Sequence, residues 1–366
     1  MSVEIWPHIA PDALKAAIEE TEKRELDWLI EDLHETLSNL KHGLEDCYAL
    51  LAPIDPGSTL VLSTPRNEVV KGHVTRVGTR IVKGTIHLRM RTLPHQTLTI
   101  NPEHPIHLTP LTNLHSLLTH SIDLLNLTLT YSYPSPTATT PIPSDLPPPN
   151  FLSAQLRLLS QSLSEASALL KGPPLTAPDP SWTSQSVAPS HFTPPQPPTL
   201  DGGPGSSSSG SANPSLSFHL GVQDSSLILS LRSLEPADAP VNFGTKLALA
   251  IGTARRLEHD EADKVFGYCC SEEDHMLAAA VGPGAGSGNG GNAGPTGGSP
   301  SSHPVPLSGT RKRKPVEVFV REKVRVESAD PSLLSLSAKL TALSHTLALA
   351  RRNLAAVLGE EFDGED

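Results

Sequence analysis

The chain has 366 residues and a formal net charge of −11, from 28 Lys and Arg against 39 Asp and Glu. This acidic balance argues against a general nucleic-acid-binding protein, which needs an excess of basic residues to displace counterions from phosphates. No run approaches 18 consecutive apolar residues, and three cysteines make no disulfide framework, so we expect no membrane-spanning helix and a reducing, cytoplasmic location.

The first strong pattern is a heptad repeat between residues 22 and 51. Apolar side chains recur there at alternating spacings of four and three residues, and Trp28 and Leu29 widen the stripe. Such a pattern indicates a long helix that packs along other helices. We predict a helix within residues 12–54 whose seam is formed by Leu26, Ile30, Leu33, Leu37, Leu40 and Leu44.

The hydrophobic period changes after this helix. Residues 57–108 alternate apolar side chains with Thr, Arg and His, and turn residues such as Gly78 and Pro94 interrupt them. Strict alternation is typical of strands with one buried face. We therefore predict that residues 57–108 form part of an antiparallel β lobe.

The leucine heptads return in three later segments, residues 110–132, 150–172 and 330–359. The last begins with Asp330 and Pro331, a favourable helix start because proline at the first helical position lacks only a hydrogen bond that it could not make. Four helices with one apolar face each predict an antiparallel bundle, in which the first and last helices meet. The seam of the last helix comprises Leu336, Leu340, Leu343, Leu347 and Leu354.

Two further segments, residues 214–275 and 314–328, alternate again and complete the predicted β lobe, with a hairpin at residues 215–232. The predicted fold class is thus α+β. An antiparallel helical bundle, its α lobe made from both chain ends, carries an inserted antiparallel β lobe. Three tracts rich in Pro, Gly and Ser cannot bury enough apolar area to order themselves, and are expected to be long disordered loops: 133–149, 173–213 and 282–310.

Motifs that carry chemistry are lacking in the sequence. It has no P-loop, no nucleophile elbow and no zinc-protease motif, so we expect no catalytic residue, no cofactor and no metal site. A thiol- or metal-dependent enzyme that uses Cys269, Cys270 and nearby His275 is an alternative, because vicinal thiols bind soft metals. Adjacent side chains in a strand point to opposite faces, however, which disfavours this alternative.

Charge is unevenly distributed along the chain. Residues 1–52 contain twelve acidic residues and four Lys or Arg, whereas residues 64–92 contain seven Lys or Arg and one acidic residue. A molecule polarised in this way suits docking on a large assembly. Whether the basic strands meet lipid or protein stays open at this point.

Several segments resemble the Rogdi family. Residues 25–40, ELDWLIEDLHETLSNL, which include Trp28 and His34, are similar to the opening helix of that family. Val70, Lys71 and Gly72 precede an alternating strand, as they do in the family. The hairpin and the leucine-rich final helix follow in matching order. The resemblance implies an α lobe built from the chain ends and an inserted β lobe, and it brings no catalytic residues.

Rogdi proteins include the small subunit of the RAVE complex, a regulator of the vacuolar and endosomal proton ATPase (V-ATPase). The resemblance therefore implies a non-catalytic subunit that promotes assembly of the V-ATPase peripheral sector onto its membrane sector, and so acidification. The implied partners are the large WD-repeat subunit of the RAVE complex, V-ATPase peripheral-sector subunits and an adaptor of the Skp type. The implied location is cytoplasmic, with peripheral recruitment to vacuolar and endosomal membranes. From the residues alone, a homotypic coiled-coil scaffold that uses the same seams between chains is the other candidate.

Overall fold

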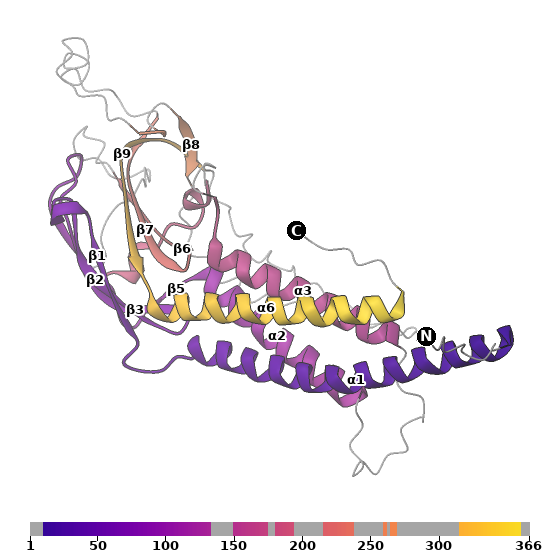
Figure 1. Ribbon diagram of the computed structural model, residues 1–366. Helices are drawn as coiled ribbons and strands as arrows, with labels where there is room; N and C mark the ends of the chain where they lie inside the picture. Colours follow the sequence, from indigo (N-terminus) through magenta and orange to yellow (C-terminus); the bar gives the residue numbers. More distant parts are fainter. Residues whose placement is uncertain are drawn as a thin grey trace, which may run out of the picture.

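A helical bundle and a pair of stacked sheets make up the molecule (Figure 1). The computed structural model describes residues 10–132, 149–174, 180–193, 215–237, 259–261, 264–268 and 315–359. The predicted α+β class is confirmed, because helices from both chain ends pack together and the strands lie between them in sequence. Of the tracts predicted as loops, 133–149, 173–213 and 282–310, the residues 133–148, 175–179, 194–213 and 282–310 lie outside the described residues.

Within the described residues, four long helices form the bundle, and each contacts two others. The first, α1, packs against α2 and α6, while α3 packs against the opposite sides of α2 and α6, so that the contacts close into a ring. Proline stands at the first helical position of α1 and of α6, where its fixed φ angle suits a helix start. The helices span Pro11–Leu50 (α1), Thr109–Ser132 (α2), Pro149–Lys171 (α3) and Pro331–Leu358 (α6).

The β lobe consists of two antiparallel sheets. In the first, the strand order is β1-β2-β3-β4, and β5 pairs with the far end of β3. In the second, the order is β6-β7-β9-β8. The strands span Ser58–Ser63 (β1), Val70–Val77 (β2), Arg80–Leu88 (β3), Gln96–Thr99 (β4), Ile106–His107 (β5), Ser215–Gln223 (β6), Ser226–Pro236 (β7), Val265–Tyr268 (β8) and Val316–Ala329 (β9).

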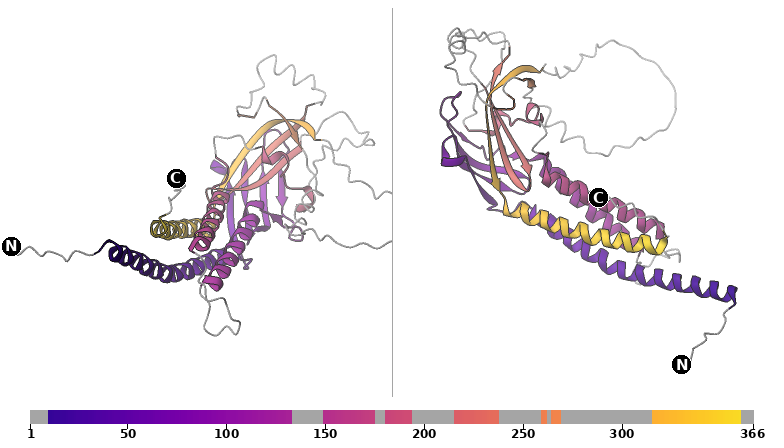
Figure 2. Two further views of the ribbon diagram at one scale, coloured as in Figure 1. Left: turned by 90° about the vertical axis from the view of Figure 1, so that its right-hand side faces the viewer. Right: turned by 45° about the horizontal axis from the view of Figure 1, so that its top comes forward.

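The two sheets stack face to face, as the views in Figure 2 show. Alternate residues of β2, such as Val70 and Val74, point inward and are fully buried, and Phe218 and Leu229 face them from the second sheet. The same cluster of buried apolar side chains continues without a break into the bundle. One hydrophobic core therefore serves both lobes.

One predicted loop is wrong in part. Within residues 173–213, the described segment 180–193 contains two short 3-10 helices, Ser181–Thr183 (η2) and Pro189–His191 (η3). It packs on the sheets through two aromatic side chains, Trp182 (1% exposed) and Phe192 (4% exposed). The many prolines of the tract predict a disordered loop, but these two aromatic rings bury enough apolar area to order the residues around them.

By length and composition alone, α6 could cross a membrane, which differs from the sequence expectation. Its apolar face has partners inside the bundle, however. Leu333, Leu336 and Leu340 are fully buried and belong to the shared core. One apolar face of α6 therefore packs between α1 and α3.

Candidate functional site

The predicted seam between α1 and α6 is buried within a single chain. Leu37 and Leu340 are both fully excluded from solvent. Leu343 is half-buried and lies against Gly43, where an added Cβ would come within 2.5 Å of its Cδ2 atom. Gly43 therefore lets the two helices approach closely. Of the eleven predicted seam positions, eight are at most 3% exposed: Leu33, Leu37, Leu40, Leu44, Leu336, Leu340, Leu347 and Leu354.

The N-terminal part of α1, residues 11–28, extends beyond the other helices (Figures 1 and 2). We call it the free arm. Every residue in it is exposed except Leu26, which is half-buried and marks where the seam begins. Ile30, four residues later, is already 7% exposed. The heptad pattern starts at Leu26 for this reason, whereas the helix itself starts fifteen residues earlier.

Three large apolar side chains on the free arm face solvent. Leu14 and Ile18 are each 48% exposed, and Trp28 is 66% exposed. At 3.6 residues per turn, they fall within an arc of about 80° on one side of the helix. The sequence suggests that Trp28 widens the buried stripe, but the Trp28 side chain faces solvent. Only Leu29 widens the stripe, at 7% exposed. The three side chains form a second stripe without a partner in the described chain, and Thr21 and Glu25 interrupt it between Ile18 and Trp28.

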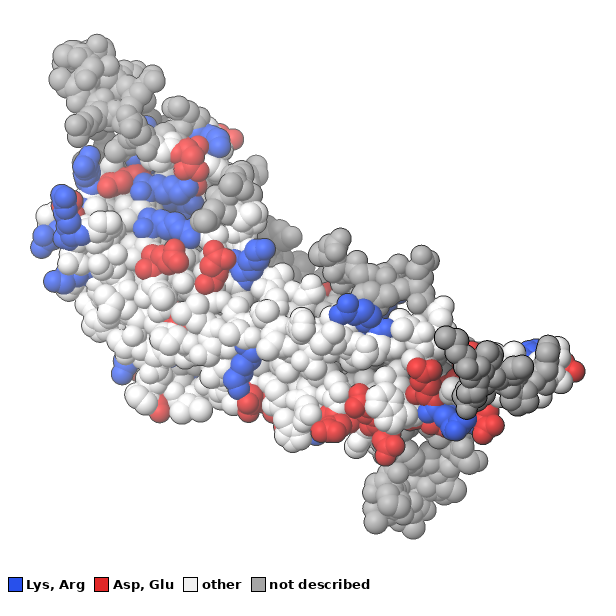
Figure 3. Space-filling model, viewed as in Figure 1, with Lys and Arg blue, Asp and Glu red and all other residues white. Residues whose placement is uncertain are grey.

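Acidic side chains surround this second stripe. Residues 11–35 contain nine acidic residues and three Lys or Arg. Figure 3 shows red side chains gathered along α1, while blue side chains gather over the β lobe. His34 is also exposed, on the flank of the seam. An apolar stripe with an acidic rim on a projecting helix is suited to bind a partner with a basic, amphipathic surface.

The other family-like positions lie on β2 and serve the first sheet. Val70 is fully buried in the core, whereas Lys71 points to solvent on the outer face. Gly72 stands where a Cβ would lie 2.2 Å from the carbonyl oxygen of Thr85 on β3. Only glycine allows the two strands to approach so closely at this point.

A buried ion pair joins the two lobes, and no pattern in the sequence indicates it. The Nε atom of Arg76, near the end of β2, donates to a carboxylate oxygen of Asp330 at 2.5 Å. The two side chains are 3% and 0% exposed. Asp330 is also the N-cap of α6, because its other oxygen accepts from the backbone N–H of Ser332 at 3.0 Å. Arg76 in turn donates to the carbonyl oxygen of Gly78.

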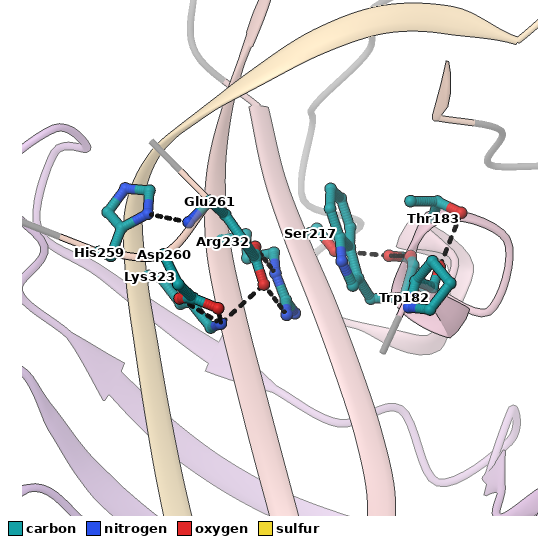
Figure 4. A network of polar contacts seen from close by, with 10 residues as sticks. Trp182, Thr183, Ser217, Arg232, His259, Asp260, Glu261 and Lys323 are labelled. Atoms are coloured by element: carbon teal, nitrogen blue, oxygen red, sulfur yellow. Dashed lines mark hydrogen bonds and ion pairs between the residues drawn. The ribbon is translucent and has the colours of Figure 1, made fainter. Parts of the chain in front are cut away.

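A second buried network stabilises the second sheet (Figure 4). Arg232 on β7 donates two hydrogen bonds to Glu261, at 2.7 and 3.0 Å, and its guanidinium lies 4.5 Å from the centre of the Trp182 ring. Lys323 on β9 donates to Glu261 at 2.7 Å and to Asp260 at 3.0 Å. The network ties the described segment 259–261 and η2 to adjacent strands.

The charge of Glu261 depends on this network. Burial is the largest single influence and raises the pKa of its carboxyl group, but the hydrogen bonds and the positive charges of Arg232 and Lys323 together outweigh burial. The net effect is a pKa below the ordinary value of 4.5. The folded state therefore favours the ionised carboxylate.

This shift predicts acid sensitivity of the second sheet. A lowered folded pKa gives stability that is present above 4.5, the ordinary value, and is lost as the pH falls through the folded pKa. We expect the melting temperature to drop on acidification below about pH 4.5, and to drop less steeply in Glu261→Gln. Thermal unfolding followed by circular dichroism between pH 7 and pH 3 measures how steeply the melting temperature of each protein changes with pH. Glu103→Gln, at an exposed turn position, should follow the wild-type curve, and equal slopes for all three proteins would contradict the role of Glu261.

Side chains with reactive chemistry are few in the described segments. Cys47 is buried in the seam, and burial raises the pKa of its thiol to about 11, so that it stays protonated at neutral pH. No group of three or more His, Cys, Asp or Glu within these segments could hold a metal ion. Cys269, Cys270 and His275, the residues of the enzyme alternative, lie outside them.

Comparison with known families gives one match. The family described as Rogdi leucine zipper containing protein matches residues 25–355, which includes both lobes and begins inside the free arm. No curated protein matches the chain significantly. Because the match spans most of the sequence, and because the leucine seam lies where the helices of both chain ends meet, the chain belongs to the Rogdi leucine-zipper family.

Proposed function

We propose that this protein is a non-catalytic subunit of a RAVE-type complex, which promotes assembly of the V-ATPase peripheral sector onto the membrane sector. Family membership over residues 25–355 is the observation that carries this proposal. The proposed partners are the large WD-repeat subunit, peripheral-sector subunits and an adaptor of the Skp type. The proposed location is the cytoplasm, with recruitment to vacuolar and endosomal membranes.

The free arm supports a role in assembly. Leu14, Ile18 and Trp28 present an apolar stripe that the bundle does not use, and the acidic rim around them would select a basic surface. We assign this stripe to the large WD-repeat subunit. The seam itself is buried within one chain, so a homotypic coiled coil through Leu37 and Leu340 would first have to open the bundle.

Affinity purification of the tagged full-length protein from its own cells tests the proposal. We expect a large WD-repeat chain and V-ATPase peripheral-sector subunits to co-purify, as identified by mass spectrometry. The double variant Leu14→Asp and Ile18→Asp should lose the large subunit, because two carboxylates would replace exposed apolar contacts, while its melting temperature stays unchanged. Wild-type protein that purifies without these partners would overturn the proposal.

A matched variant separates the stripe from the rest of the arm. Ala13→Asp and Ala16→Asp add the same two negative charges at exposed positions of the same helix that lie outside the arc of the stripe, and they remove no large apolar side chain. This pair should retain more of the large subunit than the variant of Leu14 and Ile18. Equal loss in both double variants would show that charge, and not the apolar stripe, makes the contact.

Deletion of the gene provides an independent measurement. Cells without the protein should contain normal amounts of V-ATPase subunits, but a smaller fraction of peripheral-sector subunits on membranes and less acidic vacuoles or endosomes. Re-expression of wild-type protein should restore both quantities. Normal sector assembly and normal acidification in the deletion strain would refute the assembly role.

A further inference from the structure

The outer face of the first sheet carries a cluster of basic and hydroxyl side chains that neither the core nor the proposed function uses. Along β2 and β3, alternate residues point to solvent. The register places Lys71 directly opposite His87, and His73 directly opposite Thr85. Thr97 of β4 lies beside His87, and their Oγ1 and Nδ1 atoms are 2.9 Å apart, which fixes the orientation of the imidazole ring.

A hollow of about 320 Å³ opens on this face. His73 and Lys83 contribute their basic side chains to its lining, and Thr85, Thr99 and Thr193 contribute hydroxyl groups. An ammonium group, an imidazole and several hydroxyls are the donors that proteins use to bind phosphate oxygens. His73, Lys83 and the three threonines therefore supply donors for a phosphate group, while most of the solvent-accessible lining of the hollow is apolar.

The five strands of the first sheet contain no acidic residue. Between residues 58 and 108 the chain has two carboxylates, Glu68 and Glu103, and both lie in turns outside the strands. Lys71 and His87, by contrast, are cross-strand neighbours on the same face. Basic groups that lie directly opposite each other repel when both are charged, and a bound anion relieves that repulsion.

The shape of the face favours a membrane over a peptide. An extended peptide binds at a free strand edge or in a groove between elements, whereas these side chains spread across the middle of a sheet. Val61, 67% exposed on β1, lies directly opposite His73 and adds an apolar side chain to the basic surface. Arg89 continues the basic row beyond His87, exposed at the end of β3. In Figure 3, basic side chains gather at this margin of the β lobe.

We propose that the outer face of the first sheet binds membranes that contain phosphorylated lipid headgroups, and that the hollow between His73, Lys83 and Thr99 receives a headgroup phosphate. Lys71 and Arg89 attract the anionic membrane surface through their charge alone, and Val61 contacts the headgroup layer. This inference concerns the purified chain alone and stands whether or not the protein joins a RAVE-type complex.

Vesicle flotation of the purified full-length protein tests the proposal. The probes are vesicles of phosphatidylcholine alone, with phosphatidylserine, or with phosphatidylinositol 4-phosphate at matched total charge, all at about 100 mM salt. We expect the tightest binding to the phosphoinositide vesicles. Because each Lys near an anionic bilayer contributes about fivefold in affinity, Lys71→Gln with Lys83→Gln should weaken binding at least tenfold. Lys15→Gln with Lys23→Gln, an equal charge change on the free arm, should leave binding unchanged.

A single variant separates headgroup recognition from general charge attraction. His73→Gln should weaken binding to phosphoinositide vesicles more than binding to phosphatidylserine vesicles, because only the former place a phosphomonoester in the hollow. Soluble inositol phosphate should compete with the phosphoinositide vesicles. Melting temperatures of all variants, measured in parallel, verify that each is folded.

Three results would overturn the proposal. The first is absence of binding to any anionic vesicle. The second is equal loss of binding in the two double-lysine variants, since the contact would then not be specific to the sheet. The third is binding of a soluble phosphoserine peptide more tightly than the phosphoinositide vesicles, because the face would then be a phosphopeptide site.

Discussion

Asp330→Asn should lower the free energy of unfolding by about 3 to 5 kcal/mol, because it leaves the guanidinium of Arg76 as an uncompensated buried charge. Both side chains are almost completely excluded from water, at 3% and 0% exposed. Asparagine keeps the shape of the side chain and an oxygen that can accept from the N–H of Ser332. The loss therefore reports mainly the missing negative charge and not the helix cap. Urea denaturation followed by circular dichroism measures it.

Two further variants serve as controls for this prediction. Asp46→Asn removes a carboxylate that also binds a basic group, Lys339, at 2.6 Å, but that pair is exposed to solvent and its loss should leave stability unchanged. The double variant Arg76→Met and Asp330→Asn should recover much of the lost stability, since no unpaired charge remains buried. Wild-type stability in Asp330→Asn alone would mean that the ion pair does not hold the lobes together.

The position of this pair explains why we expect such a large effect. Asp330 is the residue between the last strand, β9, and the last helix, α6, while Arg76 lies near the end of β2 in the other sheet. Ser58 of β1 and Ser332 of α6 lie close by, with their hydroxyl oxygens 3.3 Å apart. Both sheets and the bundle therefore meet at Asp330. Removing its charge weakens the joint between the lobes.

The sequence predicted elements whose signal is local. The heptad spacing from Leu26 to Leu44 could be read directly, because a period near 3.5 residues keeps one apolar side along a helix. The alternation around Val70 and Val74 predicts strands of the first sheet, because a period of two residues places the apolar side chains on one face of a strand. That the first and last helices meet followed from the need of each apolar face for a partner, and α1 does pack against α6.

The features that escaped prediction join residues far apart in the chain. Arg76 and Asp330 are 254 positions apart, and Arg232 and Glu261 are 29 apart, so no local pattern reveals either pair. The prolines around Trp182 predict a loop, so no local pattern indicates that its side chain is buried. The free arm had one local signal: the helix can begin near Pro11, but the seam begins only at Leu26. That difference in length was the available evidence for an unpartnered segment.

Leu37→Asp should produce the largest loss of stability, at least about 5 kcal/mol, which is comparable to the whole stability of many domains. Truncating a buried leucine to alanine already costs about 2 to 5 kcal/mol. Aspartate adds an unpaired carboxylate at a position with 0% exposure, and burying such a group is strongly unfavourable. We expect the helical signal of the bundle to be lost at temperatures where the wild-type protein is fully folded.

The matched control is Ile18→Asp, the same kind of change on the same helix, at a position 48% exposed on the free arm. It should leave the melting temperature unchanged, because Ile18 has no place in the core cluster. The dependence of the melting temperature on protein concentration then distinguishes a seam within one chain from a seam between chains. Within one chain, the melting temperature of the wild-type protein is independent of concentration, whereas a seam between chains makes it rise with concentration. Since Leu37 and Leu340 are buried by contacts within one chain, we expect the melting temperature to be independent of concentration. A rise with concentration, or an unchanged melting temperature in Leu37→Asp, would refute the intramolecular bundle.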